Sequence, residues 1–169
     1  LHANAPLARD LSRQIVAVAP RATLVVLTNP VDVLTTIVWE ASGLPRERVL
    51  GSGGLLDSLR FRCLLADRFH VRPSEVDAIV LGEHGERAVP LFSRVRVRGR
   101  PMSLSPEERT QIQAELKGIS MRVIAGKGGT AFGPAGATAS LLHALVSPRP
   151  STAPASVVLH GEYGVQDLA

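Results

Sequence analysis

Cysteine is nearly absent from this 169-residue chain, which has a single one, Cys63. One thiol cannot form an internal disulfide, so the chain does not depend on the disulfide framework of small secreted domains. Cys63 lies in the apolar run 61–65, where we expect it to serve as a small core residue rather than as a nucleophile. A reducing, cytoplasmic setting fits this composition best.

Long apolar runs are missing as well. No stretch approaches the roughly 18 apolar residues that indicate a membrane-spanning helix, so we expect no membrane partner. Residues 1–4 show neither the basic nor the apolar region of a secretory signal peptide. Hydrophobic residues still make up 45% of the chain and charged residues 20%, which is typical of a soluble globular protein.

Lysine is scarce, with two among the 19 basic residues of a chain whose net charge is +4. The basic residues are scattered, except for a series that alternates with valine: Arg94, Arg96, Arg98 and Arg100. Alternation predicts one face of a half-buried strand that runs into a turn at Gly99. A solvated strand face is the favoured interpretation and an anion site is the alternative. Few aromatic residues lie nearby for bases to stack on, so we expect no nucleic-acid partner.

Apolar periodicity in the first 50 residues predicts an α/β layer. Residues 6–19 have helical spacing, with an expected inner face of Leu7, Leu11, Ile15 and Val18. Residues 22–27 form the continuous aliphatic run of a buried parallel strand. Helical spacing resumes over 33–41 and stops at Gly43.

The remaining residues predict helices mixed with short strands. A flexible joint is expected at 51–54, helices at 56–69 and 135–146, strands at 76–81 and 156–160, and the first arm of a hairpin at 89–97. Ser105 and Glu108 have the spacing of a capping box that starts a helix towards residue 125. Its expected inner residues are Ile112, Leu116, Ile119 and Val123.

A glycine cluster at 126–131 satisfies the pattern G-x-G-x-x-A of dinucleotide-binding loops. That fingerprint requires a preceding strand and an acidic residue about 20 positions later. Here a capped helix precedes the cluster, and no acidic residue occurs between Glu115 and Glu162. We interpret the cluster as a chance match and expect no pyrophosphate site in this chain.

Single polar residues at the ends of apolar elements are better candidates for chemistry. Asn29 follows a buried strand, where α/β sheets expose their ligand-binding edge, although a turn residue before proline is the alternative. Asp57 and Arg60 share a helix face and could equally form a surface ion pair. His84, between glycines after a strand, could be a base, a ligand or a structural loop residue.

Taken together, a series of ordered motifs resembles the lactate and malate dehydrogenases and covers essentially the whole chain. The motifs are Thr28-Asn29-Pro30-Val31-Asp32, Leu56-Asp57-Ser58-Leu59-Arg60-Phe61-Arg62, Gly82-Glu83-His84-Gly85-Glu86, Lys127-Gly128-Gly129-Thr130 and Gly161-Glu162-Tyr163-Gly164. The family more often has Asp where this chain has Glu86, a conservative change that leaves His84 intact.

The resemblance implies roles for six residues in hydride transfer between a 2-hydroxy acid and NAD. His84 would accept and return the hydroxyl proton, because imidazole, with a pKa of about 6.5, titrates near neutral pH. Asp57 would bond its other ring nitrogen and stabilise the imidazolium. The substrate-binding residues would be Arg60, which grips the carboxylate as a bidentate fork, Asn29, which bonds the reacting oxygen, and Thr130, which lines the pocket. Leu27 and Asn29 would contact the nicotinamide, and the bond from Asn29 to Pro30 would be cis.

The resemblance also implies an architecture. It is the end of a Rossmann-type parallel sheet in residues 1–50, followed by an α+β catalytic domain with antiparallel hairpins in residues 51–169. The amino-terminal nucleotide-binding half and the last helix of the family would lie outside these residues, so this chain alone should not catalyse. No metal is implied.

Two further implications concern the substrate and the assembly. Residues 53–57 and 130–135 are most similar to lactate-dehydrogenase-like malate dehydrogenases, which favours malate. L-lactate, or a non-catalytic fragment that keeps the fold for assembly, is the alternative. A cytoplasmic homodimer or homotetramer active in the tricarboxylic acid cycle is expected.

Overall fold

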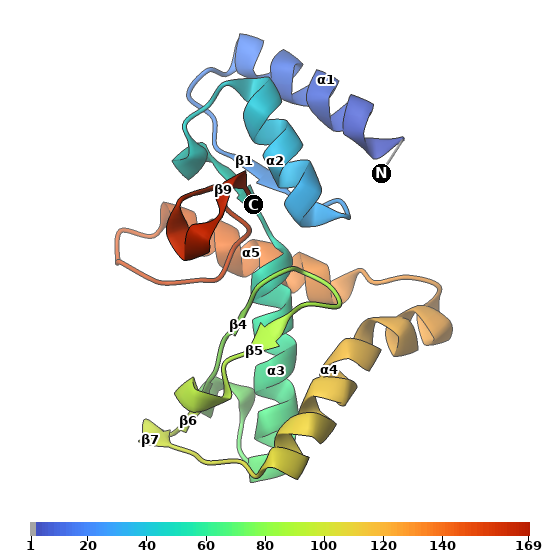
Figure 1. Cartoon of the computed structure of the whole chain (residues 1–169), viewed down its shortest axis with the longest axis vertical. Helices are drawn as coiled ribbons and strands as arrows, with labels where there is room; N and C mark the ends of the chain where they lie inside the picture. The colour runs from blue at the N-terminus through green and yellow to red at the C-terminus, as the bar shows by residue number, and fades with distance from the viewer. Residues whose placement is uncertain (1–2) are drawn as a thin grey trace. The chain divides into compact units, whose positions relative to one another are not determined.

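The computed structural model describes residues 3–169, which divide into two compact units (Figure 1). Unit 1 joins the residues up to Gly53 with the segment Ala155–Ala169, and unit 2 is Gly54–Pro154. Unit 1 is therefore discontinuous in sequence. The boundary at residue 50 between a Rossmann-type part and a catalytic part stays a prediction.

Unit 1 is an α/β layer, as the sequence predicts. Its elements are α1 (Asn4–Val18), β1 (Leu24–Val26), α2 (Val31–Ser42), the 3₁₀ turn η1 (Arg46–Arg48), β2 (Val49–Gly51), β8 (Leu159–His160), the 3₁₀ turn η4 (Glu162–Gly164) and β9 (Gln166–Leu168). Strands β1 and β2, which α2 connects, pair in parallel with each other. Strands β8 and β9 pair antiparallel. Gly43 ends α2 at φ +63°, a conformation that suits glycine at a helix C-terminus.

The inner face of α1 differs from the prediction. Leu7, Leu11, Ile15 and Val18 are all exposed, whereas Ser12 is buried and Ala8 and Val16 pack on the core around Val38 and Val49. Small side chains let two helices approach closely, and α1 lies along α2 through this narrow face (Figure 1). The exposed apolar stripe lies about 100° around the helix, on a neighbouring face that periodicity alone assigned wrongly to the core.

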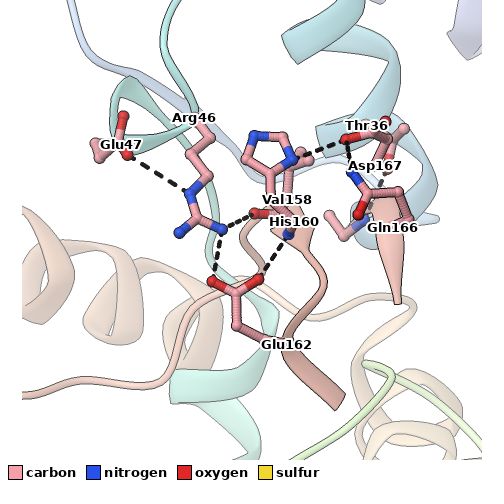
Figure 2. A network of polar contacts seen from close by, with 9 residues as sticks. Thr36, Arg46, Glu47, Val158, His160, Glu162, Gln166 and Asp167 are labelled. Carbon is pink, nitrogen blue, oxygen red and sulfur yellow. Dashed lines mark hydrogen bonds and ion pairs between the residues drawn. The ribbon is translucent and has the colours of Figure 1, made fainter. Parts of the chain in front are cut away.

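The segment Ala155–Ala169 is tied to the rest of unit 1 by polar contacts. Figure 2 shows Glu162 between the Arg46 guanidinium, 2.8 Å from its Oε1, and the backbone N–H of His160, 2.6 Å from its Oε2. His160 Nδ1 lies 2.7 Å from Asp167 Oδ1. The expected strand at 156–160 is reduced to β8 and a bridge between Ser156 and Gly51.

Unit 2 combines three helices with short antiparallel strands. The elements are α3 (Gly53–Phe69), the 3₁₀ turn η2 (Pro73–Glu75), β3 (Val76–Asp77), β4 (Val80–Leu81), β5 (Val89–Pro90), the 3₁₀ turn η3 (Phe92–Arg94), β6 (Arg96–Val97), β7 (Arg100–Pro101), α4 (Pro106–Lys127) and α5 (Phe132–Val146). Strand β4 pairs with β5, and β3, β6 and β7 form a second small sheet.

The core of unit 2 lies where α3 and α4 run side by side against the small strands (Figure 1). Phe61 is completely buried and meets the Phe92 ring edge-on at a centroid distance of 5.3 Å. The capping box at the start of α4 is confirmed, because Ser105 Oγ accepts from the Glu108 N–H at 3.2 Å and Ser105 N–H donates to Glu108 Oε2 at 2.6 Å. Ile112 and Leu116 are buried as predicted.

Several local predictions for unit 2 are wrong. The expected joint at 51–54 does contain the boundary between the two units, at Gly53 and Gly54, but it is shorter than expected because α3 already begins at Gly53. The strand expected at 76–81 is split between two sheets, and the 89–97 arm is interrupted by η3, which removes Arg94 from the predicted strand face. Cys63 is exposed, since it lies about 200° around the helix from the buried Phe61. Its partial desolvation and the Asp67 carboxylate raise the pKa of the Cys63 thiol.

Candidate active site

Asp57 lies in the second turn of α3 and is buried, with 8% of its surface exposed. The apolar residues on either side, Leu55, Leu56 and Phe61, are buried as well, and Phe61 belongs to the core of unit 2. A carboxylate in such a position needs partners, because burying an unpaired charge is costly. Two cationic or titratable side chains provide them.

His84 is carried by the turn between the antiparallel strands β4 and β5. The turn begins at Gly82, whose φ of +80° and whose approach to the Arg87 carbonyl, 2.9 Å from where a Cβ would lie, both require glycine. The N–H of Ala88 donates to the Gly85 carbonyl at 3.3 Å and closes the turn. Strand pairing therefore fixes both ends of the segment that presents His84.

The imidazole of His84 meets the Asp57 carboxylate, with Nδ1 2.6 Å from Oδ2. Both side chains are largely buried, at 16% and 11% exposure. An ionised carboxylate can only accept hydrogen bonds, so Nδ1 carries the proton and donates it to Asp57. This assigns the tautomer and leaves Nε2 as the ring atom that gains or loses a proton.

Arg60 completes the cluster from the same helix. Its Nη1 lies 3.4 Å from the other Asp57 oxygen, Oδ1, and its side chain is 14% exposed. The i, i+3 spacing predicted that Asp57 and Arg60 share a face, and the structure confirms it. Of the two interpretations that the sequence left open, an isolated surface pair is wrong, because Asp57 also binds His84.

The other predicted site residues lie elsewhere in their own units. Thr130 is exposed in unit 2, in the short link between α4 and α5. Leu27, 50% exposed, and the exposed Asn29 belong to unit 1 and follow the carboxyl end of β1. The Asn29–Pro30 bond is cis, as expected. The structure thus brings together three of the six residues and places Leu27 and Asn29 on the other unit.

Two models of protein families match the chain. Residues 1–51 match the lactate/malate dehydrogenase NAD-binding domain, and residues 55–169 match the lactate/malate dehydrogenase α/β C-terminal domain. The chain belongs to the lactate/malate dehydrogenase family. The predicted fold class and the predicted family are therefore confirmed.

Named relatives include both kinds of dehydrogenase. The malate dehydrogenase of Halobacterium salinarum is 41% identical over 98% of this chain and 54% of its own length. L-lactate dehydrogenase 1 of Staphylococcus aureus is 39% identical over 85% of this chain and 47% of its own length. The chain spans about half the length of the curated relatives it matches.

Solved structures show the same fold. The malate dehydrogenase from Aeropyrum pernix superimposes with a TM-score of 0.93 at 34% identity, covering 99% of this chain and 57% of that one. The minor L-lactate dehydrogenase from Enterococcus mundtii gives 0.92 at 33% identity, covering 98% and 55%. The parallel pair β1–β2 and the antiparallel strands of unit 2 are thus the family's architecture.

The part of the chain that matches the NAD-binding domain of the family, residues 1–51, has exposed residues at a sheet edge. Leu27 and Asn29 are exposed just past the carboxyl end of β1, where parallel α/β sheets bind their ligands. The glycine cluster at 126–131 lies between α4 and α5, so a helix and not a strand precedes it. Residues 3–169 contain no cluster of three or more side chains arranged for a metal ion.

Sequence reasoning assigned no role to two residues that lie beside Asp57 and His84 in the structure. Gly82 was quoted in a motif without a role, although a glycine after a strand is a signal for a turn with positive φ. Ser58 likewise stands in a motif without a role, because a serine in a helix carries no distinctive pattern. The structure buries it completely beside Asp57.

Proposed function

We propose that the protein to which this chain belongs is an NAD-dependent malate dehydrogenase that uses His84 as its acid/base residue. The observation that carries this proposal is the bond between His84 Nδ1 and Asp57 Oδ2 at 2.6 Å, with Arg60 on the second oxygen of the same carboxylate. A base, its orienting acid and a carboxylate-binding cation are the groups that oxidation of a 2-hydroxy acid requires.

The proton is handled by His84. In the oxidation direction Nε2 accepts the hydroxyl proton of the substrate, and in reduction it returns that proton to the carbonyl oxygen. Asp57 holds Nδ1 protonated, and the carboxylate stabilises the imidazolium that forms. Asp57 therefore orients the base and does not itself exchange a proton with the substrate.

Arg60 binds the substrate carboxylate. Its guanidinium is planar, permanently charged and able to donate two parallel N–H bonds, which a lysine cannot do. The contact to Asp57 involves Nη1, which holds the side chain while other N–H groups of the fork bind the substrate. Thr130 lines the substrate pocket.

The cofactor side of the reaction belongs to unit 1. Bound NAD supplies the hydride acceptor on the nicotinamide ring. The backbone at Leu27 faces that ring, and the Asn29 side chain donates to the reacting oxygen of the substrate. Asn29 is held from the amino-terminal helix, because the side-chain amide of Asn4 donates to its carbonyl at 3.1 Å.

Malate is the favoured substrate and L-lactate the alternative. Support comes from the relatives, since the malate dehydrogenase of Halobacterium salinarum matches 98% of this chain and the lactate dehydrogenase of Staphylococcus aureus 85% at similar identity. A second alternative, a non-catalytic fragment that keeps the fold for assembly, is disfavoured by the intact pairing of Asp57 with both His84 and Arg60.

We further propose a cytoplasmic homodimer or homotetramer that acts in the tricarboxylic acid cycle. A reducing compartment agrees with the exposed, unpaired Cys63. None of the helices in the described residues has the length and apolarity needed to cross a bilayer.

The test uses the complete product of the gene that encodes this chain. Reduction of NAD is measured with L-malate and with L-lactate as substrates, in the native protein and in a His84→Ala variant. We expect a higher kcat/KM for malate and a loss of at least a hundredfold in the variant. A preference for lactate would establish the alternative substrate, and near-native turnover of the His84→Ala variant would overturn the mechanism.

A further inference from the structure

We propose that Ser58 is a positioning residue that fixes the distance between Asp57 and His84 by joining helix α3 to strand β4. Ser58 is completely buried, and it is not one of the charged residues of the site. The catalytic meaning of this role rests on the function proposed above, whereas the geometric link itself does not.

The link consists of hydrogen bonds through a single oxygen atom. Ser58 Oγ accepts from the backbone N–H of Val80 at 2.9 Å and donates to the Gly54 carbonyl of its own helix at 2.9 Å. The Val80 carbonyl lies at 3.5 Å from the same oxygen. One hydroxyl therefore satisfies a strand donor and a helix acceptor at once.

Among the contacts of the described residues, Ser58 is the acceptor for the N–H of Val80 on the side of β4 that faces α3. The sheet of β4 contains only β4 and β5, so one edge of β4 faces α3 instead of another strand. Val80 is opposite Pro90, which has no N–H to offer the Val80 carbonyl, and this carbonyl also lies near Ser58 Oγ. Since Val80 is 1% exposed, water cannot replace Ser58, and a lost hydroxyl would leave a buried donor unpaired.

The two ends of this link coincide with the two halves of the site. Ser58 directly follows Asp57 in α3, and Val80 precedes His84 by four residues, through the turn that Gly82 starts. A shift of β4 along α3 would therefore move Nδ1 relative to Oδ2. A charge-assisted bond of 2.6 Å weakens steeply when its length or angle changes, so the anchor sets its strength.

The experiment follows the protonation of His84 by nuclear magnetic resonance in the complete product of the gene that encodes this chain, without measuring turnover. The His84 signal is identified as the one that is lost in a His84→Gln variant. The pH midpoint of His84 is then compared in native protein, Ser58→Ala, Ser58→Thr and Ser12→Ala. Ser12 is the matched control, a buried serine in α1 of unit 1 whose hydroxyl donates to the Arg9 carbonyl at 2.9 Å.

We expect Ser58→Ala to lower the His84 midpoint by about half a pH unit or more, because the imidazolium loses part of its contact with Asp57. Ser58→Thr keeps the hydroxyl and should keep the midpoint, even where its added methyl lowers overall stability. Ser12→Ala should leave the midpoint within about 0.1 unit. An unchanged midpoint in Ser58→Ala, or equal shifts in the two alanine variants, would overturn the proposal.

An Asp57→Asn reference variant separates this inference from the proposed function. It gives the shift for complete loss of the carboxylate, and Ser58→Ala should fall between it and the native protein. If Asp57→Asn leaves the His84 midpoint unchanged, the His84–Asp57 pair fails as the basis of the mechanism. If Asp57→Asn shifts it and Ser58→Ala does not, the pair stands and only the positioning role of Ser58 is overturned.

Discussion

The Asp57 carboxylate joins two side chains that have different tasks in the proposed reaction. Its Oδ2 lies 2.6 Å from His84 Nδ1, and its Oδ1 lies 3.4 Å from Arg60 Nη1. His84, the proposed acid/base residue, and Arg60, the proposed anchor of the substrate carboxylate, are thereby both held by one side chain in the second turn of α3. Any change that moves this carboxylate should affect proton transfer and substrate binding together.

Replacing Asp57 with Asn should impair proton transfer at His84. The amide keeps the shape but cannot stabilise the imidazolium, and it can present a donor to Nδ1. We expect kcat for malate oxidation to fall about a hundredfold or more, and its pH profile to move to lower pH. Steady-state kinetics of the complete gene product between pH 5 and pH 9 would measure both. Asp67→Asn, at an exposed site on the same helix, should leave the profile in place.

Replacing Arg60 with Lys should weaken substrate binding, although the charge is kept. A lysine cannot form the bidentate pair with a carboxylate, and a bond of this kind contributes about 2 kcal/mol, which corresponds to roughly a thirtyfold rise in KM. Initial rates at varied malate concentration would show it. The control is the same substitution at Arg68, which lies near the end of α3 and pairs with Glu108. A similar KM in both variants would argue against Arg60 as the anchor.

Replacing Phe61 with Ala should destabilise unit 2 by about 3–5 kcal/mol, because it empties the centre of the core and removes the edge-on contact with Phe92. Urea unfolding followed by circular dichroism would measure the loss. Phe132→Ala is a matched control, since that ring is 83% exposed and its removal should change stability by less than about 0.5 kcal/mol. Equal effects at both positions would contradict the core described here.

Acid should destabilise the fold between about pH 4.5 and about 2. The backbone amides of Glu162 itself and His160, together with Arg46, hold the pKa of Glu162 at about 2 instead of 4.5. Bonds from Arg98 and Arg72 hold the pKa of Glu75 at about 2. Because each pKa is lower in the folded state, the stabilisation is complete above about pH 4.5 and is lost as the pH falls towards 2.

The matching experiment compares urea midpoints at pH 6 and pH 3 for native protein, Glu162→Gln and Glu86→Gln. Glutamine at 162 cannot ionise, so this variant should be less stable at pH 6 and lose less stability on acidification. Glu86→Gln, at an exposed position, should behave like native protein. An identical pH dependence in all three proteins would show that Glu162 does not contribute.

Local chemistry allowed much of this fold to be predicted from sequence. Gly43 and the Ser105–Glu108 box mark helix ends through backbone conformation and hydrogen bonds within a few residues, and both predictions hold. The His84–Asp57 pairing is different, because 27 positions separate the two residues. No local pattern predicts such a contact, and it came from the resemblance of whole motifs to a known family.

The wrong predictions share one physical cause. Periodicity shows that a helix face or strand is apolar, but not which element covers it. The stripe containing Leu7 and Leu11 is as periodic as a core face, yet α1 packs on α2 through the smaller Ala8 and Ser12 side. The run 76–81 is apolar except for Asp77, yet β3 and β4 join different sheets. Both outcomes are decided by partners far along the chain.

The return of Ala155–Ala169 to unit 1 has a consequence for biosynthesis. The ribosome makes α1, β1, α2 and β2 first, but Ser156, which bridges to Gly51, and Ala169, whose N–H donates to Thr36 Oγ1 at 3.0 Å, come only after all of unit 2. A nascent chain can therefore complete the unit that holds Asp57 and His84 while unit 1 still lacks its closing hairpin. During translation, the residues that form the Asp57–His84 pair are therefore all synthesised before those that close the fold carrying Leu27 and Asn29.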